Sequence, residues 1–335
     1  MLKFNLENFL AFIRNKNILI TTHDLVDIDG LVSCLTLKFF LNLYFKKQDI
    51  TIYFSELSKS TKNFIKHFNE KFPEFDISYK KSFDLTNIDI LIILDTNNLN
   101  QIKINNNLDI TQIKIPYIFI DHHYRKLDSK SSNNGSLDLI NENYSSTAEI
   151  ILELFEFYKR SLTIPLKILN ISAILTDSGY FKHGNNKSIQ NVSILLCEEI
   201  KIQDIFLLLK SEIDISEKIA NIKGLQRVDL IREGEYLIGK THVSSFGASV
   251  ASMLIKIGFD IGIVVSKELN QCIINTRAKK TVCIKTGLNL GKILEEISER
   301  YKSSGGGHDG AASITINVDS DIIIQEIIEK VKEYL

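Results

Sequence analysis

Three polar residues of this 335-residue chain stand in a spacing that suits a metal ion. His23, Asp27 and Asp29 form the pattern HxxxDxD directly after an apolar run at 17–22. Carboxylates placed this close together repel one another unless a cation or proton lies between them. The pattern therefore predicts a divalent-metal site. The alternative is that Asp27 or Asp29 only caps the helix expected to follow.

Two further apolar runs also end in acids, and one of them adds histidines. Asp95 follows one run, and Asp121, His122 and His123 follow the next. In an open parallel sheet, ligands bind outside the carboxyl ends of the strands, so we expect these residues to meet at one edge. Each also has a simpler interpretation: Asp95 as a turn or helix cap, and the two histidines as satisfied core residues.

A fourth acid stands at the end of an expected apolar helix at 166–176. Asp177 ends that helix, and Gly179 supplies a position at which a helix can terminate. A carboxylate at the end of a buried helix needs a partner, which can be a metal ion or a nearby turn. Ser145 or Ser146 is the expected N-cap of the helix before it.

The elements that must position these residues alternate between strands and helices. This alternation predicts an α/β fold with a doubly wound, mainly parallel sheet. The expected strands are 17–22, 49–54, 88–94 and 116–120, and the expected helices include one from Leu31 onward and one at 58–71.

The chain is long enough for two domains, and its C-terminal part has its own series of elements. We expect a first domain at 1–200, a helical connector at 201–217 and a smaller α/β domain at 218–335, with a cleft between the two domains. In the second domain the expected strands are 235–243, 261–265, 271–277 and 313–318, and the expected helices are 248–257, 290–301 and one at the end.

A glycine-rich stretch in the second domain could bind an anion. Gly305, Gly306, Gly307 and His308 allow close approach of the backbone and several N–H donors, and Arg277 could clamp a phosphate. The alternatives are a flexible loop for the glycines and a solvent-facing arginine.

Composition limits the protein's environment and partners. Hydrophobic residues make up 44% and charged residues 24% of the chain, which is typical of a globular protein. We expect a cytoplasmic location, since no apolar run is long enough for a membrane helix and the start lacks a signal-peptide pattern. The four cysteines form no CxxC pair, and a net charge of -1 argues against a broad surface for duplex nucleic acid.

Taken in order, these motifs resemble those of the DHH/DHHA1 phosphoesterase family. They are similar to its small two-domain members, which act as oligoribonucleases (nanoRNases), as phosphatases of 3'-phosphoadenosine 5'-phosphate (pAp), or as phosphodiesterases of cyclic di-AMP and its linear product pApA. The matching motifs are His23-xxx-Asp27-x-Asp29-Gly30, Asp95-Thr96, Asp121-His122-His123, Ser145-Ser146-Thr147-Ala148-Glu149, Thr176-Asp177-Ser178-Gly179 and Gly305-Gly306-Gly307-His308.

The resemblance implies a phosphoric ester hydrolase with two metal ions, usually Mn²⁺, with Mg²⁺ or another divalent cation as the alternative. It assigns one ion to His23, Asp27 and Asp95, and the other to Asp29, Asp95, His122 and Asp177. Oxygen and imidazole donors without thiolate agree with Mn²⁺ or Mg²⁺.

The same resemblance implies roles in substrate binding and catalysis for the remaining motif residues. His123 would donate to the scissile phosphate, Asp121 would orient both histidines, and Arg277 with the stretch from Gly305 to His308 would bind the rest of a short RNA or dinucleotide.

Three other functions stay open: an inorganic pyrophosphatase, a RecJ-like single-strand exonuclease and a non-catalytic nucleotide sensor. Leu25-Val26 stands where many relatives carry Asn-Pro, which bears on the choice of substrate. The preferred substrate, the direction of exonuclease cleavage and a homodimeric state are not decided by these residues.

Overall fold

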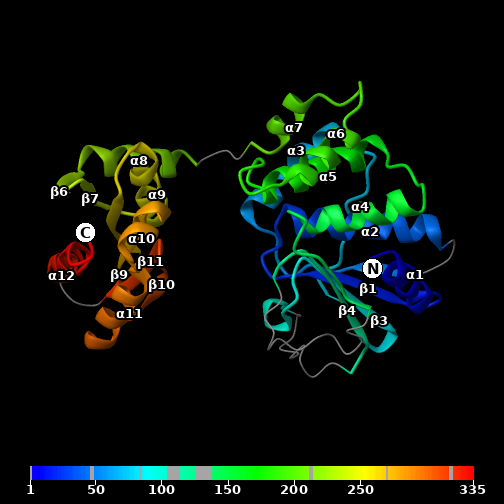
Figure 1. Cartoon of the computed structure of the whole chain (residues 1–335), viewed down its shortest axis with the longest axis horizontal. Coiled ribbons are helices and arrows are strands. Elements are labelled where there is room, and N and C mark those ends of the chain that lie inside the picture. The colour runs from blue at the N-terminus through cyan, green and yellow to red at the C-terminus, as the bar shows by residue number, and fades with distance from the viewer. Residues whose placement is uncertain are drawn as a thin grey trace. The chain divides into compact units, whose positions relative to one another are not determined.

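This computed structural model describes residues 2–45, 49–82, 85–103, 114–124, 137–210, 214–268, 271–316 and 320–335. The chain divides into two compact units, Met1–Ser211 and Glu212–Leu335, which are described separately (Figure 1). Within the described ranges, no helix is both long and apolar enough to cross a lipid bilayer.

The first unit is built on a five-stranded parallel sheet. Its strand order is β2-β1-β3-β4-β5. The strands are β1 (Ile18–Thr22), β2 (Ile50–Ile52), β3 (Ile90–Leu94), β4 (Tyr117–Asp121) and β5 (Leu139–Ile140). The helices are α1 (Leu2–Ile13), α2 (Ile28–Tyr44), α3 (Lys59–Lys71), α4 (Thr147–Phe157), α5 (Ile164–Asp177), α6 (Asn186–Leu195) and α7 (Ile202–Leu208), with 3₁₀ turns η1 (Leu85–Asn87) and η2 (Leu99–Gln101). The predicted α/β class with a mainly parallel sheet is confirmed.

Both faces of this sheet are covered by apolar side chains. In β3, Ile90, Ile92 and Leu94 belong to the main core cluster, whereas Leu91 and Ile93 belong to a second cluster on the opposite face. This alternation follows the two-residue repeat of a strand. It explains why β3 is apolar at every position, as the sequence indicated, and why its first polar side chain comes just beyond its carboxyl end.

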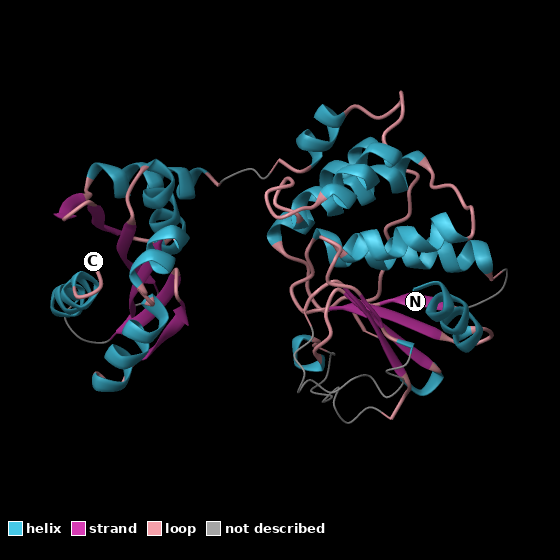
Figure 2. Ribbon diagram, viewed as in Figure 1, coloured by secondary structure: helices cyan, strands magenta, loops and turns pink. Residues whose placement is uncertain are grey.

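Helices α2, α4 and α5 lie together against one face of the sheet (Figure 2). Their aromatic residues interlock: the rings of Phe40 and Phe155 lie 5.2 Å apart in an edge-on arrangement. This packing fixes the N-terminus of α4 and the C-terminus of α5 relative to the ends of the strands.

The turn between β1 and α2 differs from its prediction. The helix begins at Ile28 rather than near Leu31, because the Asp27 carboxylate accepts a hydrogen bond from Gly30 N at 2.9 Å and caps it. Gly30 therefore lies inside the helix, not in the turn. A Cβ atom there would lie 2.7 Å from Thr22 Oγ1, so the glycine lets α2 approach β1 closely.

The second unit is built on a six-stranded mixed sheet. The strand order is β10-β11-β9-β8-β7-β6, and only the β7–β8 pair is parallel. The strands are β6 (Asp229–Glu233), β7 (Tyr236–Val243), β8 (Ile261–Glu268), β9 (Gln271–Ala278), β10 (Ser304–His308) and β11 (Ala311–Ile316). The helices are α8 (Ile215–Gln226), α9 (Gly247–Ile257), α10 (Lys280–Thr286), α11 (Leu290–Arg300) and α12 (Ser320–Lys332).

The glycine-rich stretch is a strand, not a loop. Residues 304–308 form β10, which pairs with β11 from Ser304↔Thr315 to His308↔Ala311. Gly307 explains how a glycine tract fits into a sheet: a Cβ atom there would lie 2.3 Å from the carbonyl oxygen of Ala311. The last strand accordingly begins at Ala311, two residues before the predicted start, and the sequence analysis missed β6 and α10 altogether.

Candidate metal centre

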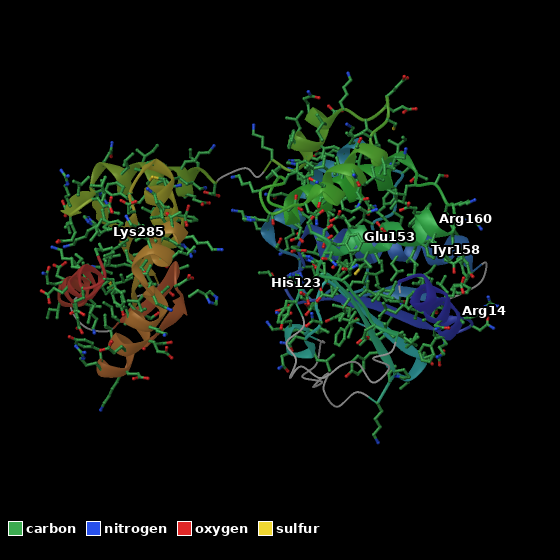
Figure 3. All side chains as sticks on the ribbon, viewed as in Figure 1. Arg14, His123, Glu153, Tyr158, Arg160 and Lys285 are labelled. Carbon is green, nitrogen blue, oxygen red and sulfur yellow. The ribbon has the colours of Figure 1, made fainter. Side chains whose placement is uncertain are left out.

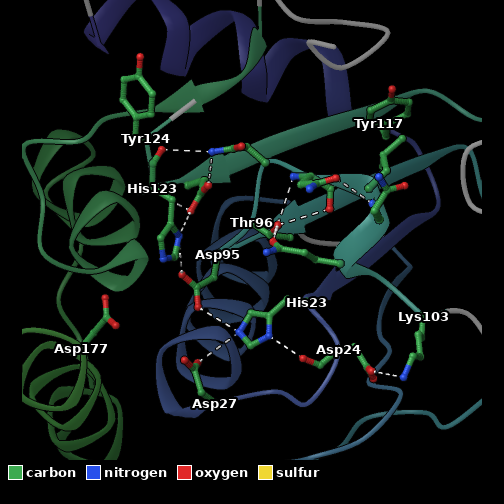
Figure 4. Close-up of a pocket in the computed structure, with 16 residues that line it drawn as sticks. His23, Asp24, Asp27, Asp95, Thr96, Lys103, Tyr117, His123, Tyr124 and Asp177 are labelled. Carbon is green, nitrogen blue, oxygen red and sulfur yellow. Dashed lines mark hydrogen bonds and ion pairs between the residues drawn. The ribbon is translucent and has the colours of Figure 1, made fainter. Parts of the chain in front are cut away.

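The carboxyl ends of β1, β3 and β4 and the end of α5 bring the predicted ligands together. Figure 4 shows His23, Asp27, Asp95 and Asp177 directed toward one space. The groups whose donor atoms lie within 4.8 Å of one another include His23 with Asp27 and Asp95, and Asp29 with His122 and Asp177.

In the outer group, His23 stands between two carboxylates. Its Nε2 atom lies 3.6 Å from Asp27 Oδ1 and 3.6 Å from Asp95 Oδ2. The other ring nitrogen, Nδ1, lies 2.7 Å from the carbonyl oxygen of Asp24 and donates to it. That bond fixes the tautomer in which the Nε2 lone pair is available to a cation.

In the inner group, two buried polar atoms face each other without a hydrogen bond. His122 Nε2 lies 3.0 Å from Asp177 Oδ2, yet neither atom has a hydrogen-bond partner among the described residues. His122 Nε2 also lies 3.6 Å from Asp95 Oδ1, so the two oxygens of Asp95 face the two histidines of different groups. Asp95 is thus the residue that both groups share.

Asp29 is oriented by the N-terminus of α4. Its carboxylate accepts hydrogen bonds from the backbone N–H groups of Thr147 and Ala148, at 2.6 and 3.0 Å. Thr147 also donates from its hydroxyl to Asp95 Oδ1 at 3.1 Å. Helix N-termini favour anionic groups, so α4 stabilises the buried Asp29 carboxylate and ties it to the shared Asp95.

Glu149 completes the start of α4. Its buried carboxylate accepts bonds from the N–H and hydroxyl of Ser145 and from the Asn191 amide, all at 2.8 to 2.9 Å. The N-cap is Ser146, which makes no side-chain cap bond. Glu149 therefore accepts the hydrogen bonds of the preceding turn in place of the Ser146 side chain.

Asp121 orients one histidine rather than the expected pair. It accepts from His123 Nδ1 at 2.8 Å and from Asn97 Nδ2 at 2.7 Å, while His122 faces Asp177. Asn97 also donates to the carbonyl oxygen of His123 at 3.1 Å. The His123 ring, 56% exposed, projects from the end of β4 (Figure 3).

The shared residue has an unusual backbone. Asp95 has φ +58°, in the left-handed region that few residues other than glycine adopt, although asparagine and aspartate do so more often than most. Its N–H donates to the carbonyl of Ile120 at 2.9 Å, which anchors it to β4. Backbone strain of this kind persists where the surrounding structure fixes it, and it concentrates at functional sites.

Burial and crowding of the carboxylates shift the pKa values of the centre. Burial, with repulsion from Asp95 and Asp177, raises the pKa of Asp29, and burial raises that of Asp95 to about 6. Against the effect of burial, hydrogen bonds to Asp27 and Asp95 raise the pKa of His23 to about 11. The bond to Asp121 raises the pKa of His123 to about 9. Without a bound cation, these raised pKa values favour protonation of the carboxylates and histidines of the centre.

The donor set fits hard or borderline divalent cations. It consists of carboxylate oxygens and imidazole nitrogens, without a thiolate, which suits Mn²⁺ or Mg²⁺. The unpartnered His122 Nε2 and Asp177 Oδ2 atoms, and the excess of buried carboxylates, are the features that a bound cation would satisfy.

A pocket of about 1270 Å³ opens beside the centre and continues past it. Its lining includes His23, Asp95 and His123 at one end and the segment from Asn97 to Lys103 beyond them. The acidic edge is therefore accessible to a ligand much larger than an ion.

The comparisons with known proteins identify the two units. Residues 17–176 match the DHH family, N-terminal domain, and residues 242–335 match the DHHA1 domain. The chain combines a DHH domain with a DHHA1 domain. The DHH match covers the ends of β1, β3 and β4, and the DHHA1 match covers most of the second sheet, so the resemblance seen in the motifs is confirmed.

Similar proteins cover nearly the whole DHH–DHHA1 chain. An uncharacterized protein of Methanocaldococcus jannaschii is 27% identical over 322 residues, which is 96% of this chain and 94% of that protein. The crystal structure of an exopolyphosphatase-related protein from Bacteroides fragilis aligns with a TM-score of 0.67 at 17% identity, covering 99% and 95% of the two chains. The similarity to the Bacteroides fragilis structure shows that the two chains share a fold.

Membership in this phosphoesterase superfamily makes the chain an enzyme of the hydrolase class. DHH enzymes depend on divalent metals, in agreement with the acidic cluster. The sequence analysis missed Asn97 and Thr147, although Thr147 stands within a motif that it quoted and Asn97 directly follows the motif Asp95-Thr96. Their amide and hydroxyl groups gave no signal of their own, since only the fold places them against Asp121 and Asp95.

Proposed function

We propose that this protein is a phosphodiesterase, dependent on Mn²⁺ or a similar cation, that hydrolyses short oligoribonucleotides or dinucleotides such as pApA and cyclic di-AMP to mononucleotides. The observation that carries the proposal is the pair of ligand groups joined at Asp95 beside an open pocket. Activity on pAp as a phosphatase would use the same centre.

In the reaction, a water molecule releases a proton to the solvent as its oxygen bonds to phosphorus, the bond from phosphorus to the leaving oxygen breaks, and that oxygen takes up a proton. Bound divalent cations lower the pKa of water and offset the negative charge of the phosphate oxygens. His123 supplies the proton, because its raised pKa keeps the ring protonated at neutral pH. Asp121 and Asn97 keep that ring in position.

The register of the second sheet supports a substrate role for Arg277 and His308. Ala311 pairs with His308 on one side and with Arg277 on the other. Residues directly opposite one another in antiparallel strands project from the same face, so both side chains stand on one face with only a methyl group between them.

The neighbouring row of this face is also polar. Ser313 pairs with Gly306 and with Asn275, and its side chain is exposed. Gly306, at φ +154°, has no atom within 4 Å of a would-be Cβ, so the edge of the sheet is open beside Ser313. We propose that this face binds a phosphate or the sugar of the substrate.

The proposal is tested by assaying the full chain with Mn²⁺ on RNAs from dimers to roughly 10-mers, pAp, pApA, cyclic di-AMP and pyrophosphate. We expect mononucleotide release from the short substrates, and its loss in His122→Ala. His242→Ala is the matched control, since this exposed histidine lies on β7 of the second unit.

Each alternative function has its own outcome in that assay. Hydrolysis of pyrophosphate alone would assign a pyrophosphatase, and activity that increases with RNA length would assign a RecJ-like exonuclease. Tight binding of cyclic di-AMP without turnover of any substrate would assign a sensor.

A further inference from the structure

The pocket has a second wall that the metal centre does not use. Beyond the acidic edge it is lined by Asn98, Asn100, Gln101 and Lys103 and by Tyr117 of β4, whereas Tyr124 lines the pocket on the side of His123 (Figure 4). Asn98, Asn100, Gln101 and Lys103 lie in and around the short turn η2 (Leu99–Gln101), which follows β3 and Asp95 along the chain.

Hydrogen bonds fix the backbone of this wall. Asn98 caps η2 by accepting from Asn100 N at 3.0 Å, and the Gln101 side chain accepts a bond from the Thr96 hydroxyl while donating none to the described part of the chain. The carbonyl oxygen of Gln101 accepts from Asp24 N at 2.6 Å, which ties η2 to the turn beside His23. The wall is therefore positioned relative to the metal centre before any ligand binds.

The polar groups that this wall presents are amides. Among the described residues, the Asn100 amide and the Gln101 Nε2 atom have no hydrogen-bond partner, and both side chains are exposed at the pocket. An amide can donate and accept at once, which matches the mixed donors and acceptors on the edge of a nucleobase.

The net charge of the wall is close to zero. Lys103 is the one lysine or arginine among the described residues that line the pocket, and its Nζ lies 2.6 Å from Asp24 Oδ2. Asp24 in turn accepts from Ser55 at 2.7 Å. A wall built for a second phosphate, or for polyphosphate, would present unpaired cations instead.

We infer that this amide wall, centred on Asn100 and Gln101, binds the nucleoside next to the scissile phosphate and so selects nucleotide esters over pyrophosphate and polyphosphate. Tyr124, whose side chain is 65% exposed, offers an aromatic ring on which a base can stack. The inference rests on the proposed function for its position beside the scissile bond.

The test compares two chromogenic diesters with Mn²⁺ present: the p-nitrophenyl ester of thymidine 5'-monophosphate, which carries a nucleoside, and bis(p-nitrophenyl) phosphate, which does not. The ratio of kcat/KM for the first ester to that for the second should fall about tenfold in the double variant Asn100→Ala/Gln101→Ala, through a higher KM. Asn100→Ala alone should give part of this fall.

Two further variants define the controls. Gln190→Ala, on an exposed position of α6, should leave the ratio unchanged. An unchanged ratio in the double variant would overturn the inference. So would a ratio that responds to Lys103→Ala and not to the amide pair, since the wall would then bind a charged group.

A binding measurement separates this inference from the proposed function. Fluorescently labelled adenosine 5'-monophosphate is titrated into wild type and into the double variant, and we expect about tenfold weaker binding by the variant. Wild type that binds the nucleotide but hydrolyses neither ester would contradict the proposed function alone. Equal binding by both proteins would contradict the inference alone.

Discussion

The two halves of the metal centre use the same residue types in different surroundings. In the outer half, 47% of the Asp27 side chain is exposed and His23 borders the pocket. In the inner half, Asp29 is 1% exposed and is surrounded by the α4 N-terminus and the core. The outer carboxylate is solvated and also caps a helix, whereas the inner one is buried and accepts from backbone N–H groups and the Ser33 hydroxyl.

This difference shows which interactions stabilise a buried carboxylate in an apolar core. Two backbone N–H groups, the Ser33 hydroxyl and the dipole of α4 compensate Asp29 only in part, since its pKa remains raised. The inner half should therefore gain more from a cation than the outer half. The following predictions test this contrast, beginning with the residue that both halves share.

Asp95→Asn should reduce kcat/KM by about 10³-fold or more, because both cation sites lose a carboxylate oxygen and several kcal/mol of transition-state stabilisation. Asparagine tolerates the left-handed backbone, so the fold should be retained. The control is Asp89→Asn, at the amino end of the same strand, where the carboxylate accepts from Asn17 N. Equal activity of the two variants would contradict the shared role of Asp95.

Asp29→Asn should weaken Mn²⁺ binding by about 10²-fold, and Asp27→Asn by about tenfold, because a charge interaction is several times stronger near the protein interior than in water. Asparagine at position 27 can still cap α2. Isothermal titration calorimetry on the two variants measures the contrast, and the opposite order of affinities would refute it.

Asp121→Asn should move the alkaline limb of the pH–rate profile. His123 has its pKa raised to about 9 by Asp121, so its proton is available below that pH and is lost above it. In the variant the pKa should fall toward the ordinary value near 6.5, and the rate should decline at a pH lower by up to about 2.5 units. A profile identical to wild type would show that His123 does not supply the proton.

The smallest effect concerns stability in the absence of metal. Asp95 has a folded-state pKa of about 6, above its ordinary 3.8, so its contribution to stability is complete below pH 3.8 and is lost as pH rises through 6. A divalent cation binds the ionised form and should reverse this loss. The rise in Tm caused by Mn²⁺, measured by calorimetry, should therefore increase between pH 5 and pH 7 by several degrees.

Most of the first unit could be predicted from the sequence because the patterns that specify it are local. Continuous apolar runs that end in acids predicted β1, β3 and β4 and their common edge, and the order of the motifs predicted which residues would meet. The family resemblance implied that Asp121 would orient both His122 and His123, whereas Asp121 bonds to His123 alone. The directions of these adjacent side chains depend on Asp177 and Asn97 from distant segments.

The second unit shows where local signals fail. Three consecutive glycines indicate a loop by propensity, yet they form β10, in which Gly307 lets the strand pack closely against the backbone of β11. Strand β6 was missed because its residues are largely exposed and follow no apolar pattern. Tertiary contacts outweigh propensity in both cases.

The left-handed backbone of Asp95 has a consequence for how this protein can evolve. A glycine there would relax the turn after β3 and remove a buried charge, so Asp95→Gly should melt at a higher temperature than the metal-free wild type while being inert. Stability alone would favour glycine at position 95, so the aspartate there trades thermal stability for a side chain that both ligand groups of the metal centre share.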